Sequence, residues 1–96
     1  MRTTPPRIEL VFFRGCPHAD AAREALRTAL KGMGLPIQWY EWDQARSDTP
    51  SHLLGYGSPT VLVGGRDVTG AEGRNGGRAC RADGAPSYQM IVAALQ

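Results

Sequence analysis

The chain has 96 residues, enough for one small domain whose core forms without disulfides or a structural metal. Its 42% hydrophobic residues, 21% charged residues and net charge of +2 are ordinary for a globular protein, and no run of Lys and Arg indicates a nucleic-acid surface. No apolar run approaches the roughly 20 residues of a membrane span, and the N-terminus lacks the apolar core of a signal peptide. We therefore expect one cytoplasmic domain over residues 1–96, with a flexible tail over residues 1–6 and neither nucleic acid nor membrane as a partner.

The stretch from Ile8 to Ala19 carries the strongest structural signal. Its apolar residues 8–13 predict a buried strand, which Arg14 and Gly15 end. Pro17 then suits the first position of a helix, and apolar residues recur at helical spacing as far as about residue 33. The pattern therefore places Cys16 where a strand passes into a helix.

This position indicates a reactive thiol at Cys16. The unpaired N–H groups and the dipole of a helix N-terminus stabilise an anion. They lower the pKa of a thiol from about 8.5 to roughly 3.5–7.5. We expect Cys16 to be a nucleophile and His18 to assist it by hydrogen bonding or charge. The alternative is a structural cysteine that ends a buried strand.

The remaining elements follow in a simple order. Residues 36–42 predict a second strand, and the short connections around the first helix imply a right-handed parallel crossover. Thr49 and Pro50 predict the start of a short helix through residue 54. Two strands over residues 60–63 and 66–69 joined by Gly64-Gly65 form a hairpin, and a last helix follows Pro86. The expected order is β-α-β-α-β-β-α, with a Gly/Arg-rich loop over residues 70–84.

The Cys16-Pro17-His18 opening of a helix after a strand resembles the active site of the thioredoxin-like superfamily, whose usual motif is Cys-x-x-Cys. Ala19 stands where the second cysteine of that motif would be. The resemblance implies the minimal thioredoxin fold, an α/β fold with a four-stranded mixed sheet and flanking helices. Because Ala19 is not a cysteine, a dithiol mechanism confined to this motif is excluded.

Pro59 stands where thioredoxin-like proteins place a cis-proline opposite the active cysteine, and the pattern from Pro59 to Gly70 is similar to glutaredoxins. The resemblance implies that a substrate docks against Pro17, Ser58, Pro59 and Thr60. It also implies a thiol or disulfide of a substrate protein, or glutathione, as the partner. No cofactor is expected, apart from glutathione as a co-substrate. Residues 70–73 depart from the glutaredoxin pattern Gly-Gly-x-Asp, which weakens the expectation for glutathione.

Cys80, the only other cysteine, follows four glycines in the 70–84 loop. Glycine gives this loop reach, so Cys80 is a candidate resolving thiol for Cys16; the alternative is an incidental loop thiol.

Three functions remain open. The first is a thiol–disulfide oxidoreductase with Cys16 as nucleophile. The second is binding of a soft metal such as mercury or copper(I), or organomercurial-type chemistry, by Cys16, Cys80 and Asp20, a set that resembles alkylmercury lyases in residue type. The third is a non-catalytic interaction module.

Overall fold

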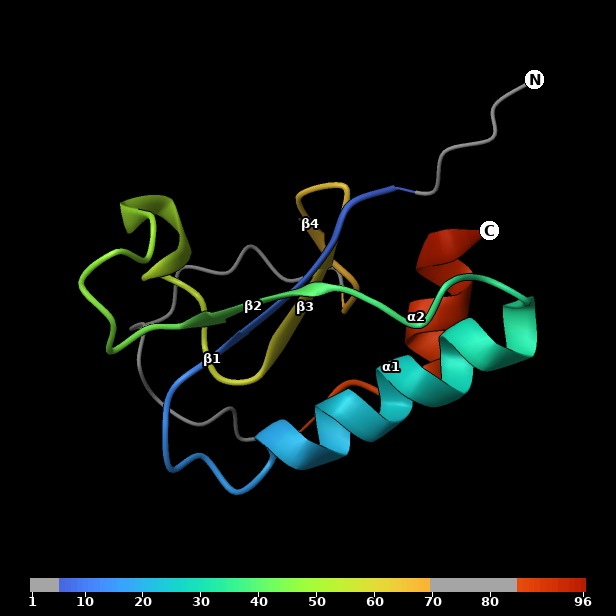
Figure 1. The fold of residues 1–96 in the computed structure, drawn as a ribbon, viewed down its shortest axis with the longest axis horizontal. Coiled ribbons are helices and arrows are strands. Elements are labelled where there is room, and N and C mark those ends of the chain that lie inside the picture. The colour runs from blue at the N-terminus through green and yellow to red at the C-terminus, as the bar shows by residue number, and fades with distance from the viewer. Residues whose placement is uncertain (1–5, 70–84) are drawn as a thin grey trace.

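The computed structural model describes residues 6–69 and 85–96, and its centre is a four-stranded mixed sheet (Figure 1). The strand order is β2-β1-β3-β4. β1 is parallel to β2 and antiparallel to β3, which is antiparallel to β4. The bounds are Ile8–Phe12 for β1, Tyr40–Asp43 for β2, Thr60–Val63 for β3 and Arg66–Asp67 for β4. The expected α/β class and four-stranded mixed sheet are confirmed.

Two α-helices, α1 (Ala19–Met33) and α2 (Tyr88–Leu95), cover one face of the sheet. α1 begins two residues after Pro17 because residues 13–19 form successive turns, from the Cys16 N–H to the Phe13 carbonyl (3.0 Å) and from the Ala19 N–H to the Cys16 carbonyl (3.3 Å). α1 ends at Gly34, whose left-handed φ of 72° suits glycine. The core between sheet and helices consists of Ile8, Leu10, Ala22, Leu26, Ala29, Leu30, Val61, Val63 and Ile91.

The other face of the sheet is packed differently. Val11 and Leu62 contact Leu53, which belongs to a single 3₁₀ turn, η1 (Ser51–Leu53). The prediction of a middle helix is therefore wrong, and the described residues contain two α-helices rather than three. The reason is length: glycine at 55 and 57 leaves too few residues to propagate a helical nucleus. Thr49 does not cap this turn, since its hydroxyl donates to the Asp43 carbonyl at 2.6 Å.

β1 ends one residue earlier than predicted, and two other strands are shorter by two residues or more. β2 begins at Tyr40, because a tight turn from the Gln38 N–H to the Pro36 carbonyl (3.1 Å) keeps residues 36–38 out of the ladder. β4 ends at Asp67, whose carboxylate accepts the backbone N–H of Thr69 at 2.9 Å and turns the chain. Residues 70–84, which the sequence predicts to be a loop, and residues 1–5 lie outside the described residues. Within residues 6–69 and 85–96, no helix has the length and apolar character needed to cross a membrane.

Candidate active site

Cys16 lies in the turn between β1 and α1, as the sequence predicts, and its residue is only 8% exposed. The turn fixes its backbone at both sides, through the bonds to Phe13 and Ala19 described above. Its Sγ atom lies 3.5 Å from the carbonyl oxygen of Ser58 and donates a hydrogen bond to it. The thiol is therefore held against a segment 42 residues away in the sequence.

Ser58 is the residue that ties this segment to the end of β1. It is fully buried, and its hydroxyl oxygen accepts the backbone N–H of Phe13 at 3.0 Å. The Ser58–Pro59 peptide bond is cis, as expected, and the Pro59 side chain is fully buried. Thr60 closes the segment with a hydrogen bond from its hydroxyl to the Gly57 carbonyl, at 2.7 Å. The structure thus brings Ser58 to Cys16, while Pro17 is exposed beside the thiol.

Opposing electrostatic effects act on the Cys16 thiol. The bond to the Ser58 carbonyl requires the proton and therefore favours the neutral form. The first-turn N–H groups of α1 lack intrahelical acceptors and favour the thiolate. Arg14, two residues before Cys16, is exposed, and its Nε atom lies 3.3 Å from the buried carboxylate of Asp43. Its charge is therefore paired with Asp43, and the bond to the Ser58 carbonyl must be broken before Cys16 can be deprotonated.

His18 and Asp20 lie at the start of α1 in different environments. His18 occupies the N-cap position, is half-buried and makes no side-chain capping bond. Asp20 is highly exposed and pairs with Arg23 at 2.7 Å. Arg23 also binds both carboxylate oxygens of Glu41 on β2, at 2.9 and 3.1 Å. The hydrogen bond from Arg23 lowers the pKa of the Glu41 carboxyl, and the same bond raises the pKa of Arg23.

The metal interpretation depends on Cys16, on Asp20, whose carboxylate pairs with Arg23, and on Cys80. Asp20 belongs to the surface network of Arg23 and Glu41. Residues 6–69 and 85–96 contain no group of three His, Cys, Asp or Glu side chains arranged to hold a metal ion. Cys80 lies outside the described residues, so its proposed pairing with Cys16 is not described.

Gln44 is the part of the site that sequence reasoning missed. Its backbone N–H donates to the Phe12 carbonyl at 2.7 Å, at the end of β1. Its side-chain amide donates to the carbonyls of Leu53 (3.0 Å) and Tyr56 (2.8 Å), and the residue is 1% exposed. Gln44 thus holds the segment that leads to Ser58. A single Gln in a polar loop carries no pattern that would reveal this contact.

Comparisons with protein-family models, curated proteins and solved structures found no match for this chain. Its own geometry therefore carries the functional argument. That geometry is a buried thiol at a strand–helix junction, hydrogen-bonded to the carbonyl that precedes a cis-proline.

Proposed function

We propose that this protein is a thiol–disulfide oxidoreductase of the monothiol type, in which Cys16 is the nucleophile on a thioredoxin-like fold. The observation that carries the proposal is the 3.5 Å hydrogen bond from the Cys16 thiol to the Ser58 carbonyl. The order β2-β1-β3-β4, with α1 directly after β1 and Ser58-Pro59 directly before β3, supports the thioredoxin-like arrangement. The proposed partners are thiols or disulfides of substrate proteins, with glutathione as a co-substrate.

The chemistry starts from the protonated thiol. When Cys16 loses its proton to solvent, the Ser58 carbonyl loses its donor and becomes free to accept an N–H from an extended substrate. The thiolate then attacks one sulfur of a substrate disulfide, a new S–S bond forms, and the other sulfur leaves as a thiolate with the electron pair. A second thiol, from glutathione or from a resolving cysteine, attacks the mixed disulfide and restores Cys16.

Activation of Cys16 is tested by its alkylation rate with iodoacetamide as a function of pH. Cys80→Ser isolates the Cys16 thiol, and Cys16→Ser is the matched control that isolates the other cysteine. We expect Cys16 to react with an apparent pKa below the about 8.5 of a free thiol. His18→Ala should raise this apparent pKa. An ordinary free-thiol profile at Cys16, together with no mixed disulfide in mass spectra after exposure to 2-hydroxyethyl disulfide, would contradict the proposal and favour the interaction module.

The resolving role of Cys80 is a separate step with its own test. Mild oxidation of dilute protein should remove two protons from the monomer mass, and peptide mapping should join Cys16 to Cys80. A disulfide requires Cα atoms within roughly 7 Å of each other. Oxidation that yields only Cys16 sulfenate, glutathione adducts or intermolecular dimers would exclude Cys80 as the resolving thiol and leave a monothiol enzyme.

A further inference from the structure

Ser58 belongs to a closed ring of three hydrogen bonds with Phe13 and Cys16. Its hydroxyl oxygen accepts the Phe13 N–H at 3.0 Å, and its carbonyl oxygen accepts the Cys16 thiol at 3.5 Å. The Phe13 carbonyl accepts the Cys16 N–H at 3.0 Å, which completes the ring. Ser58 is 0% exposed and Cys16 is 8% exposed. The Ser58 side chain therefore holds its own carbonyl close to the thiol.

The bond from the thiol to this carbonyl exists only while Cys16 carries its proton. A thiolate has no hydrogen to donate, and its charge would face the negative end of the carbonyl dipole. Burial of both residues leaves little water to replace the lost bond. We propose that Ser58 is a positioning residue: through its bond to Phe13, its side chain holds the carbonyl against the thiol and keeps Cys16 protonated until a substrate docks.

This inference rests on the proposed function, in which an extended substrate donates an N–H to the Ser58 carbonyl. Because Ser58 is fully buried, that N–H reaches the carbonyl oxygen only after the thiol has turned away. The thiol proton then passes to solvent, the sulfur keeps the electron pair, and the substrate N–H becomes the donor. Docking of the N–H and ionisation of the thiol favour each other, as linked equilibria require. The reactive thiolate therefore forms when a substrate is present.

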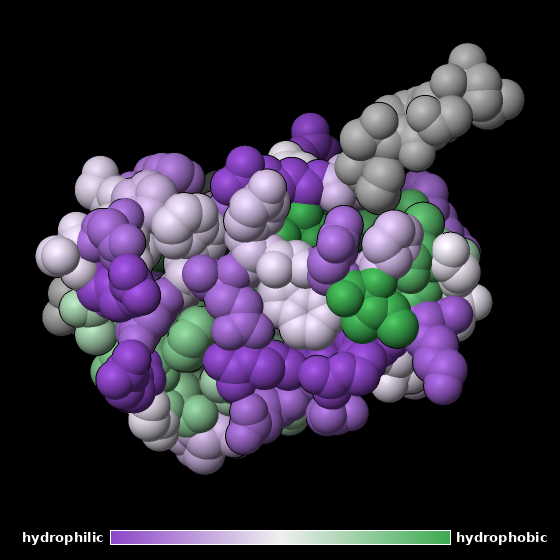
Figure 2. Space-filling view, in the orientation of Figure 1, coloured by the Kyte–Doolittle hydropathy of each residue, from purple (hydrophilic) through white to green (hydrophobic). Residues whose placement is uncertain are grey.

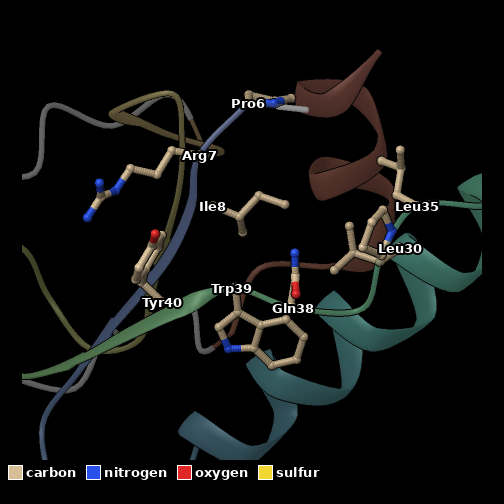
Figure 3. Close-up of a pocket in the computed structure, with 9 residues that line it drawn as sticks. Pro6, Arg7, Ile8, Leu30, Leu35, Gln38, Trp39 and Tyr40 are labelled. Atoms are coloured by element: carbon tan, nitrogen blue, oxygen red, sulfur yellow. The ribbon is translucent and has the colours of Figure 1, made fainter. Parts of the chain in front are cut away.

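The other surface features of the molecule do not lead to this carbonyl. Figure 3 shows the hollow of about 750 Å³ beside Ile8, the first residue of β1, whereas Cys16 follows the opposite end of that strand. On the face drawn in Figure 1, hydrophobic side chains are scattered among hydrophilic ones (Figure 2). These observations favour recognition of a substrate backbone at Ser58 over binding of an apolar surface on this face.

Charged groups around Cys16 also affect its ionisation. The charged and titratable side chains of residues 13–23, of the end of β2 and of residues 54–60 are Arg14, His18, Asp20, Arg23, Asp43 and Tyr56. Arg14 is paired with Asp43, and Asp20 with Arg23. Substitution of Ser58 leaves all of these groups in the chain. A difference between Ser58 variants therefore reports the bond to the carbonyl.

The test is the alkylation rate of Cys16 with iodoacetamide as a function of pH, in the Cys80→Ser protein. Adding Ser58→Ala removes the acceptor of the Phe13 N–H and loosens the carbonyl. The acid dissociation constant of Cys16 should rise by about two- to tenfold, the contribution of one hydrogen bond, so the midpoint of the pH profile should fall. The rate well below the midpoint should rise by the same factor, whereas the plateau rate at high pH should not change.

Two controls separate this role from a loss of stability. Ser58→Thr keeps the hydroxyl and should retain the midpoint of the parent protein. Ser87→Ala removes another hydroxyl that accepts a backbone N–H, at the start of α2, and should also leave the midpoint unchanged. Far-UV circular dichroism of each variant verifies folding. An unchanged midpoint in Ser58→Ala, an equal shift in Ser87→Ala, or a Ser58→Thr midpoint as low as that of Ser58→Ala would overturn the inference.

Failure of the proposed function is recognised separately. If the parent protein forms no mixed disulfide with 2-hydroxyethyl disulfide, that function is wrong, whereas the alkylation midpoints still decide whether Ser58 controls the protonation of Cys16. Infrared spectroscopy of the Cys80→Ser protein observes the bond itself, because hydrogen bonding lowers the stretching frequency of an S–H group. We expect a lowered band that rises in Ser58→Ala. A band at the frequency of a thiol without an acceptor in the parent protein overturns the proposal.

Discussion

Replacing Gln44 by glutamate is expected to destabilise the protein strongly at neutral pH. The side-chain nitrogen donates to the carbonyls of Leu53 and Tyr56, and the residue is 1% exposed. Glutamate has the same shape, but it places an oxygen where the nitrogen was. An ionised carboxylate would then face two carbonyl oxygens without solvent, which is strongly unfavourable.

The size of the effect follows from the proton that the variant must take up. Keeping a carboxyl protonated costs about 1.4 kcal/mol of folding free energy for each pH unit above its ordinary pKa of about 4.3. At pH 7 this cost is nearly 4 kcal/mol. The protonated carboxyl donates one hydrogen bond where the amide donates two, and the lost bond costs about 1 kcal/mol. The total approaches 5 kcal/mol at pH 7 and about 1 kcal/mol near pH 4, against a whole-domain stability of about 5–15 kcal/mol.

The assay is urea unfolding of the wild type and variants at several pH values from 4 to 7. The folded variant binds more protons than its unfolded state, so its deficit relative to the wild type should shrink as the pH falls toward the unfolded carboxyl pKa. Gln44→Leu is the control: it loses both bonds but also removes the side-chain oxygen of Gln44, which has no partner among the described residues. We expect it to lose about 2 kcal/mol with no pH dependence. A Gln44→Glu deficit that is small at pH 7, or that does not change with pH, would refute this reasoning.

Three further predictions concern the helices and β2. Gly34→Ala should lose about 1 kcal/mol of unfolding free energy because Gly34 has a φ of 72°. Gly32→Ala should gain up to about 0.5–1 kcal/mol, because Gly32 lies in the last turn of α1 and a Cβ there meets no other atom within 4 Å. Ser87→Ala should lose about 1 kcal/mol because the Ser87 hydroxyl caps α2. Arg23 lowers the pKa of Glu41, so their pair should stabilise the fold above the unfolded carboxyl pKa and lose this effect as the pH falls through the lower folded value. A double-mutant cycle with Glu41→Gln and Arg23→Gln should give about 0.5–1 kcal/mol at pH 7 and less below about pH 4.

The sequence predicts the parts of this fold that depend on local patterns. The apolar run at Ile8 and the helical spacing from Ala19 place β1, α1 and the thiol between them, because burial imposes that periodicity. The prediction of a middle helix is wrong because it relies on the cap signals at Thr49 and Pro50. Too few residues separate these signals from Gly55 and Gly57 for a helix to form. Gln44 was missed because its partners are backbone carbonyls, which any residue provides. Such contacts appear only once the chain is folded.

The position of the Ser58 carbonyl depends on contacts from residues just past the ends of β1 and β2. The end of β1 fixes Ser58 through the Phe13 N–H, and Gln44, just past the end of β2, fixes the preceding segment at Tyr56. The Cys16 thiol bonds to the same carbonyl, so its proton occupies the acceptor that an extended substrate requires. Substitutions that remove the Gln44 contacts should therefore alter the reactivity of Cys16.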